Sequence, residues 1–406
     1  MKIKISLLAG LAAFGFASSA FAQTTIDITG ATAFRAAANR AILALLNDGS
    51  PGTATYAWVG NPGQSGFEGS NRIIVEGFIG GDPYIIRTSQ SGSTAGIANV
   101  VNQTSPATAY LDSAGTAADR TTSGTNILPA NLAGKTASGV IARFTFSDVD
   151  QAISPTPTPA LPGVGVGVVP FVFVANVGAP AGLTNMTDQL HEAQWATGQL
   201  PLSMYTGNPA DTKLVLNTGR SDGSGTRATI LSETQYGPFR TVVQWGGPNN
   251  QTTITGGEGS GTVATLNNLG NGGYSSNSFV RQNLARTSTN VTVGAVPGND
   301  VVIISYLTLS DAAAITTVTG GPGVGARALT YNGVPYSLEN VANGQYTLWG
   351  YQQFYGSADI NLAEQAFFDA FTAVIPAQLD PLSTGIPTTL MNVTRNGGDG
   401  GPITPN

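Results

Sequence analysis

Residues 212–237, TKLVLNTGRSDGSGTRATILSETQYG, change from a strand pattern to a helix pattern across one small polar turn. Apolar residues dominate TKLVLNTG, Gly and Ser fill RSDGSG, and TRATILSETQYG has helical spacing. The same succession occurs twice earlier: TTIDITG (24–30) leads into a helix over 31–48, and PYIIRTS (83–89) leads through QSGS into TAGIANVVNQ (94–103). Strands that alternate with helices predict an α/β protein with largely parallel sheets.

Each of these three turns places small hydroxyl residues where a helix begins: Thr32, Ser93 with Thr94, and the run 223–226. Helix N-termini carry unpaired N–H groups and a partial positive charge, so they can bind anions. Arg220 adds a planar donor fork that suits tetrahedral oxyanions, and Asp222 is placed to orient or neutralise it. Small hydroxyl residues are also ordinary N-caps, so the pattern alone leaves a structural interpretation equally open.

Composition bounds the class of protein. The chain has 406 residues, 41% hydrophobic content and only 10% charged residues, which is enough for a sizeable core in two lobes or domains. MKIK, an apolar stretch and AFA (20–22) predict a signal peptide over 1–22 with cleavage near Ala22 and Gln23. Its removal leaves 15 basic against 23 acidic residues, a net charge of about −8. That charge argues against nucleic acid and acidic membranes as partners, and no later run predicts membrane insertion.

Two scarce residue types exclude several chemistries. The chain contains no cysteine, which removes disulfides, thiol catalysis and thiolate metal sites. His191 is the single histidine; no Gly-x-Ser-x-Gly turn accompanies it, and we expect a surface residue. We therefore expect neither a metal nor a cofactor, and no catalytic residue.

Other segments outline the organisation of the chain. The run SPTPTPALPGVG (154–165) predicts a linker or crossing, and VGVVPFVFVANV (166–177) predicts a buried central strand. DVVIISYLTL (300–309) predicts a strand that returns to a core, and AEQAFFDAFTAVI (363–375) predicts an amphipathic helix. Polar stretches at 49–71, 104–135 and 245–290 are interpreted as loops or insertions, and the tail 395–406 as disordered.

GRSDGSGTR (219–227) resembles the anion-binding loop of periplasmic phosphate-binding proteins of ABC importers, a branch of the type 2 periplasmic binding fold. Further matches follow in the family's order and span most of the mature chain: ITGATAFRAAANRAI (28–42), SGSTAGI (91–97), FTFSDVD (144–150), GVGVVPFVFVANV (165–177) and residues 329–355. The resemblance implies two lobes, each a mainly parallel sheet flanked by helices, joined by crossing strands. It also implies a periplasmic or secreted protein that captures phosphate or a similar oxyanion, with an ABC permease as a possible partner.

The resemblance also implies ligand-binding residues, which are Thr32, Phe34, Ser93, Asp148, Arg220, Ser224, Gly225 and Thr226. Asp222 and Gly223 would support them, with Asp222 paired to Arg220. A buried carboxylate accepts hydrogen bonds only, so Asp148 would accept the proton of hydrogenphosphate and disfavour sulfate, which has none near neutral pH.

The family's pattern is not matched everywhere. Thr94 stands where many members have glycine. In the first loop, the choice between Thr32 and Ala33 as the residue that matches the family's position depends on where a gap is placed in the alignment. The implied division is a signal peptide at 1–22, lobe 1 at 23–165, lobe 2 with the Arg loop at 166–298, a return to lobe 1 at 299–392, and the tail at 393–406. Two rivals remain: a surface or matrix protein that keeps the fold without an anion site, and an enzyme such as a phosphatase.

Overall fold

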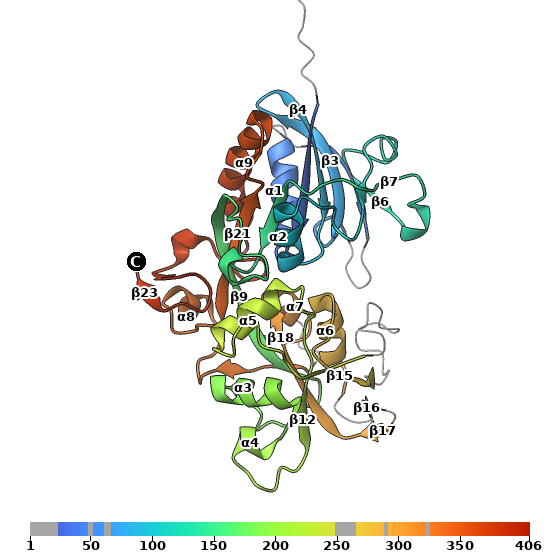
Figure 1. Ribbon diagram of the computed structural model, residues 1–406. Helices are drawn as coiled ribbons and strands as arrows, with labels where there is room; N and C mark the ends of the chain where they lie inside the picture. Colours follow the sequence, from blue (N-terminus) through green and yellow to red (C-terminus); the bar gives the residue numbers. More distant parts are fainter. Residues whose placement is uncertain are drawn as a thin grey trace, which may run out of the picture.

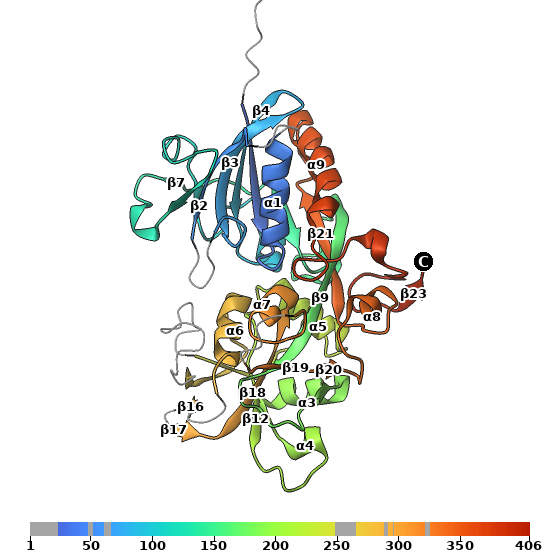
Figure 2. The same ribbon diagram turned by 180° about the vertical axis from the view of Figure 1, so that it is seen from behind.

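The computed structural model describes residues 23–47, 52–60, 66–247, 265–287, 291–294, 296–320 and 325–406. The predicted signal peptide lies outside these residues. Two lobes lie one above the other, and the chain crosses between them (Figures 1 and 2). In the residues described, no helix has both the length and the apolar character to cross a membrane.

The elements of each lobe are as follows. Lobe 1 holds β1 (Thr24–Gly30), α1 (Arg35–Leu46), β2 (Thr55–Val59), β3 (Arg72–Ile79), β4 (Asp82–Ser89), α2 (Ser93–Val101), β5 (Tyr110–Leu111), β6 (Thr125–Ile127), β7 (Thr136–Ala137), β8 (Phe144–Ser147), β21 (Trp349–Gly356) and α9 (Leu362–Val374). Lobe 2 holds β10 (Asn185–Met186), α3 (Asp188–Thr197), β11 (Gln199–Pro201), α4 (Ser203–Thr206), β12 (Leu214–Asn217), α5 (Gly225–Glu233), β13 (Gln244–Gly246), β14 (Thr265–Leu266), β15 (Asn268–Gly270), α6 (Asn277–Leu284), β16 (Val291–Val293), β17 (Val296–Asn299), β18 (Val301–Thr308), α7 (Leu309–Ala313), β19 (Arg327–Ala328), β20 (Thr330–Tyr331) and α8 (Leu338–Ala342). β9 (Gly163–Ala175) belongs to both lobes, and β22 (Val393–Arg395) and β23 (Ile403–Pro405) end the chain.

One sheet runs through the whole molecule in the order β11-β12-β18-β9-β21-β8-β1-β4-β3-β2-β6, and β19 also pairs with β9. The strands that precede the three predicted turns pair in parallel: β1 lies between β4 and β8, and β12 pairs with β18. The crossing strands and the β2-β3-β4 meander pair antiparallel. The α/β class, the two lobes and the crossing strands are thus confirmed, and the sheet is mixed, with parallel pairing where helices follow strands.

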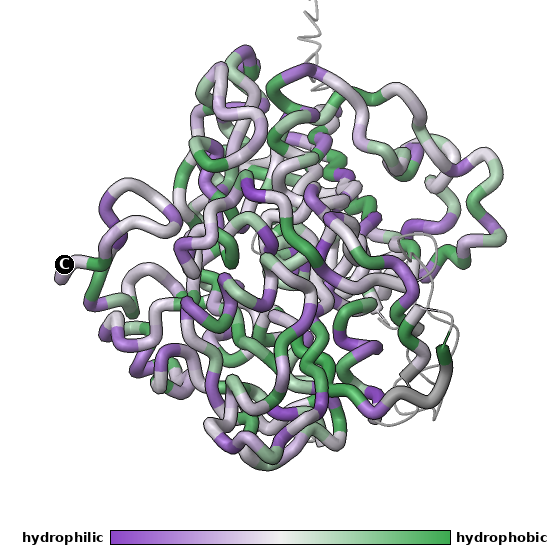
Figure 3. Tube along the Cα trace, turned by 60° about the horizontal axis from the view of Figure 1, so that its bottom comes forward, coloured by the Kyte–Doolittle hydropathy of each residue, from purple (hydrophilic) through white to green (hydrophobic). Residues whose placement is uncertain are grey.

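β9 is the strand that connects the two lobes. Residues 163–170 pair with β21 in lobe 1, and residues 171–175 pair with β18 in lobe 2. Every residue from 166 to 175 is buried, as a run of Val and Phe predicts for a central strand. One hydrophobic cluster contains residues of both lobes, for example Ile26 and Val215. Hydrophobic and hydrophilic stretches accordingly alternate along the chain (Figure 3).

The return to lobe 1 was predicted about fifty residues too early. β18 pairs in parallel with β12 and antiparallel with β9, so it is part of lobe 2, as are α7 and β19. The chain returns with β21, at Trp349. The reason is that all eight residues of β18 are buried, and a fully buried strand carries no pattern that says which sheet it joins.

Several polar segments are more regular than predicted. Within 49–71, the stretch Thr55–Val59 is strand β2, which pairs with β3, while 48–51 and 61–65 lie outside the described residues. Within 245–290, Asn277–Leu284 forms α6, while 248–264 and 288–290 lie outside the description. The tail is ordered: β22 and β23 form an antiparallel pair. Its hydrogen bonds to other segments, which a local pattern cannot reveal, explain that error.

His191 is a core residue and not a surface one. Its ring is fully buried and stacks on Trp195 with centroids 4.3 Å apart. Burial lowers its pKa to about 3, so the ring is neutral at physiological pH. The polar residues around His191 in sequence masked the helix face that points inward.

Candidate functional site

Asp148 is the point where the predicted site residues from the two lobes meet. It directly follows β8 in lobe 1 and is 2% exposed. The hydroxyl of Ser93, the first residue of α2, donates to Asp148 Oδ1. From lobe 2, Thr226 Oγ1 on α5 donates to Asp148 Oδ2 at 2.9 Å, and the Thr229 hydroxyl donates to the Asp148 carbonyl. The carboxylate therefore joins α2 of one lobe to α5 of the other.

Glycine is required where the two lobes approach most closely. A Cβ on Gly225, the first residue of α5, would overlap Asp148 Oδ1 and the Ser93 side chain. A Cβ on Gly92 would lie 2.7 Å from the Gly223 carbonyl oxygen, and Gly92 has a φ of +129°, a conformation that other residues rarely adopt. These glycines let backbone meet backbone across the gap between the lobes.

Arg220 lies at the centre of the lobe 2 side and is 1% exposed. Its Nε donates to the Tyr274 carbonyl at 3.2 Å, and its Nη2 donates to the Ser275 carbonyl at 2.9 Å. Its Nη1 lies 3.5 Å from Thr226 Oγ1. Backbone carbonyls thus fix the guanidinium, and no ion pair to Arg220 occurs within the residues described.

The helix that follows the Arg loop offers further donors. Ser224 is the N-cap of α5, and its hydroxyl accepts a hydrogen bond from the Arg227 N–H at 3.3 Å. The first-turn amides of Gly225 and Thr226 have no acceptor inside the helix, because a helix leaves its first N–H groups unpaired. Arg227 holds the loop from behind by donating to the Asn271 carbonyl at 2.9 Å.

The first turn contributes less side-chain chemistry than predicted. Thr32 is buried, and its carbonyl accepts a hydrogen bond from Arg35 Nη1 at 2.7 Å. Phe34 is the N-cap of α1, and its ring packs on Phe146 with centroids 5.4 Å apart. The Phe34 side chain is therefore part of the core, and only its backbone is available to a ligand.

The predicted pairing of Asp222 with Arg220 is wrong. Asp222 is exposed and lines a shallow outer pocket with Pro155, Arg227 and Phe239. Gly223, next to it, does take part in the close approach of the lobes through its carbonyl. Arg220 is buried, and the chain turns at residues 222–223, so the Asp222 side chain does not follow Arg220 inward and lies in solvent.

Three charged residues near Arg220 were missed: Arg35, Arg281 and Asp311, all of them buried. Arg281 Nη1 donates to Asp311 Oδ1 at 2.9 Å, which joins α6 to α7. Arg35, from lobe 1, lies close enough to Arg220, Arg281 and Asp311 for their charges to affect its pKa. Burial lowers its pKa to about 10; Asp311 opposes this, and Arg220 and Arg281 add to it.

The charge of this region favours an anion. Arg281 and Asp311 form a buried ion pair, whereas Arg35 and Arg220 are buried and form no ion pair among the described residues. Burial also lowers the pKa of Arg220, against the effect of Asp148, yet a guanidinium stays protonated in proteins. Two buried guanidinium groups, Arg35 and Arg220, that form no ion pair among the described residues are a physical reason for an anion to bind here.

The described part of the chain contains no group of three or more His, Asp or Glu side chains arranged to hold a metal ion.

Comparisons with known proteins give a likeness at the level of structure. No protein-family model and no curated protein matches the sequence. An ABC-type phosphate transport receptor from Vibrio cholerae is similar, with 13% identity, a TM-score of 0.42 and coverage of 86% of this chain and 93% of that one. So is a putative phosphate ABC transporter substrate-binding protein from Clostridium perfringens, with 14% identity, a TM-score of 0.43 and coverage of 87% and 93%. A third is PstS from Borrelia burgdorferi, with 13% identity, a TM-score of 0.40 and coverage of 87% of this chain and 97% of that one.

Proposed function

We propose that this chain is an exported solute-binding protein that captures phosphate, or a similar tetrahedral oxyanion, between its two lobes. The observation that carries the proposal is Arg220, a buried guanidinium that contacts two backbone carbonyls and the Thr226 hydroxyl in the first turn of α5, and that forms no ion pair among the described residues. A buried cation without a counterion is costly, and a bound anion removes that cost.

Each residue has a separate role in this proposal. Arg220 and the amides of Gly225 and Thr226 bind the oxyanion, and the Ser224 hydroxyl adds a hydrogen bond. The hydroxyls of Ser93 and Thr226 donate to Asp148 and orient its carboxylate in the site. Thr32 and the Phe34 backbone contribute from α1. Asp148 accepts the proton of hydrogenphosphate and thereby disfavours sulfate. The lobes close around the anion by a hinge motion and release it unchanged, with an ABC permease as the receiving partner.

Calorimetric titration of residues 23–406 with phosphate and then sulfate at pH 7 tests the proposal. The protein is first stripped of bound anion by partial unfolding and refolding. Phosphate binding with 1:1 stoichiometry, and little heat from sulfate, is the expected result. Binding of both anions would keep the site but remove the role of Asp148. No binding of either would favour a surface or matrix protein that keeps the fold without a ligand.

A further inference from the structure

The C-terminal segment, residues 393–406, lies at the level of the junction between the lobes (Figures 1 and 2). Its ends pair as β22 and β23, and the turn between them carries Asp399 and Gly400 toward the interior. Asp399 is 4% exposed. A segment rich in glycine and close to the end of the chain is thus packed into the molecule.

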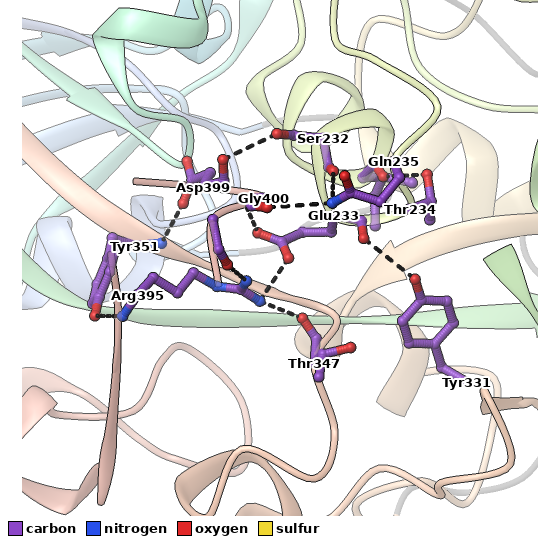
Figure 4. A network of polar contacts seen from close by, with 12 residues as sticks. Ser232, Glu233, Thr234, Gln235, Tyr331, Thr347, Tyr351, Arg395, Asp399 and Gly400 are labelled. Atoms are coloured by element: carbon purple, nitrogen blue, oxygen red, sulfur yellow. Dashed lines mark hydrogen bonds and ion pairs between the residues drawn. The ribbon is translucent and has the colours of Figure 1, made fainter. Parts of the chain in front are cut away.

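The segment is bound firmly to α5 of lobe 2 (Figure 4). Arg395 Nη2 forms an ion pair with Glu233 at 2.6 Å, and both side chains are at most 3% exposed. The Gly400 N–H donates to Glu233 Oε1 at 2.7 Å, and the Ser232 hydroxyl donates to the Asp399 carbonyl at 3.0 Å. These contacts use the last turn of the helix whose first turn carries Gly225 and Thr226.

The same segment is bound to lobe 1 and the junction (Figure 4). The Asp150 N–H donates to Asp399 Oδ2 at 2.7 Å, and the Tyr351 N–H donates to Asp399 Oδ1 at 3.1 Å. Arg395 also donates to the Thr347 carbonyl and lies over the Trp349 ring at 4.2 Å. Asp150 is two residues beyond Asp148, so Asp399 holds the turn that presents Asp148.

Asp399 lies directly behind the candidate site. A Cβ on Gly350 would lie 3.1 Å from Asp399 Oδ1 and 3.4 Å from the Asp148 carbonyl oxygen, so one glycine separates the two groups. The Asp148 carbonyl is also the acceptor for Thr229 on α5. Both halves of the site are therefore supported from behind by one short segment.

We propose that the C-terminal segment is an interlobe clasp, in which Asp399 and Arg395 position the Asp148 turn against α5 and slow the release of the bound anion. The inference rests on the proposed function. When the lobes separate, α5 moves away from the Asp148 turn, and the clasp must give up its bonds to one side. Opening then exposes part of a buried network, which is unfavourable, so the clasp favours the closed form.

Two glycines of the segment give a matched test. Gly400 and Gly397 both have a positive φ, +76° and +85°, so an alanine strains the backbone similarly at each position. A Cβ on Gly400 would overlap the Ser232 hydroxyl and lie 2.9 Å from the Ser232 carbonyl oxygen, whereas a Cβ on Gly397 meets no atom within 4 Å. Gly400→Ala therefore pushes the clasp off α5, and Gly397→Ala leaves it in place.

The phosphate dissociation rate of both variants is measured by stopped-flow at pH 7. We expect Gly400→Ala to release phosphate about tenfold faster than the unmodified chain, because one or two hydrogen bonds to α5 are lost. Gly397→Ala should release phosphate at the same rate as the unmodified chain. Equal rates in the two variants would overturn the proposal. Asp27→Asn controls for general destabilisation, because it breaks the buried pair with Arg87 (2.7 Å) inside lobe 1 and should not change release.

A second readout separates failure of the clasp from failure of the proposed function. The chain contains no cysteine, so Leu362→Cys and Met204→Cys, both exposed and on different lobes, can carry spin labels. In the unliganded protein, we expect Gly400→Ala to widen the interlobe distance distribution and Gly397→Ala to leave it unchanged. An unchanged distribution in Gly400→Ala would reject the clasp even if no phosphate binds.

Discussion

Two arginines of this protein are buried to a similar degree and have different surroundings. Arg220 is 1% exposed, and its guanidinium contacts the carbonyls of Tyr274 and Ser275 and a threonine hydroxyl. Arg395 is 8% exposed when its backbone is included, and its guanidinium forms an ion pair with Glu233 and stacks on Trp349. A buried charge needs a partner of opposite sign. Arg395 has this partner within the chain, whereas Arg220 is arranged for one that comes from outside.

This difference separates a structural arginine from a binding arginine. Removing Arg395 leaves the carboxylate of Glu233 buried and unpaired, so the cost falls on folding. Removing Arg220 relieves a buried charge and takes away the principal cation of the site, so the cost falls on the ligand. Substitutions of the two residues should therefore have opposite profiles.

The largest expected effect is that of Arg395→Met on stability. It should lower the free energy of unfolding by about 3–5 kcal/mol, because it breaks a buried ion pair and leaves one charge behind. Urea denaturation followed by circular dichroism measures it. The double variant Glu233→Gln/Arg395→Met should recover part of the loss; if it does not, the unpaired carboxylate is not the cause.

Arg220→Met should weaken phosphate binding about a hundredfold, since charge-assisted hydrogen bonds from a buried guanidinium are lost. Its unfolding free energy should change by less than that of Arg395→Met. Calorimetric titration and urea denaturation of the same sample measure both quantities. A variant that unfolds as readily as Arg395→Met, with phosphate affinity retained, would contradict the distinction between the two arginines.

Asp148→Asn tests what sets the preference of the site for phosphate over sulfate. The amide nitrogen of asparagine donates a hydrogen bond where the carboxylate could only accept one. We expect the preference for phosphate over sulfate to fall about thirtyfold, through better sulfate binding and weaker phosphate binding. Competition titration with the two anions tests this. An unchanged preference would place the discrimination elsewhere in the site.

The smallest expected effect concerns pH. Burial raises the pKa of Asp399 to about 7, and the negative charge of the Asp150 carboxylate adds to the rise. The hydrogen bonds from the Asp150 and Tyr351 backbone N–H groups and the charge of Arg395 act in the opposite direction. The folded protein then binds more protons at Asp399 than the unfolded chain does between pH 4 and 7, so this group makes stability fall as pH rises through that window.

Asp399→Asn removes this titrating carboxyl group. Between pH 5.5 and 6.5, the unmodified chain should lose up to about 1.4 kcal/mol of stability relative to this variant, and the difference should be constant above pH 8. Urea denaturation across this range provides the measurement. Parallel pH profiles would show that the Asp399 carboxyl does not titrate there.

Much of the fold could be predicted because it depends on local pattern. The alternation of apolar residues in β1, the apolar stretches of β4 and β12, the small turns and the helical spacing after them identify three strand–turn–helix units without reference to the rest of the chain. β9 was identified by its continuous Val and Phe run. The return to lobe 1 was misplaced because β18 is buried on both faces, and burial does not say which sheet a strand joins.

The site likewise contains residues that could be predicted from the sequence and residues that could not. Ser93, Asp148, Arg220 and Thr226 follow strands whose ends meet between the lobes, so their convergence follows from topology. Arg35, Arg281 and Asp311 come from three separate helices, and only the tertiary structure brings them near Arg220. The sequence does carry one signal for α6: Val280 and Leu284, four residues apart and both buried, in a segment otherwise interpreted as polar insertion.

The continuity of β9 has a consequence for how the protein denatures. Its residues hydrogen-bond in both lobes, and one hydrophobic cluster extends through the junction. Within the described residues, neither lobe could melt and leave the other with an intact core. The lobes should therefore unfold together as a single cooperative unit, with one heat-absorption peak in scanning calorimetry.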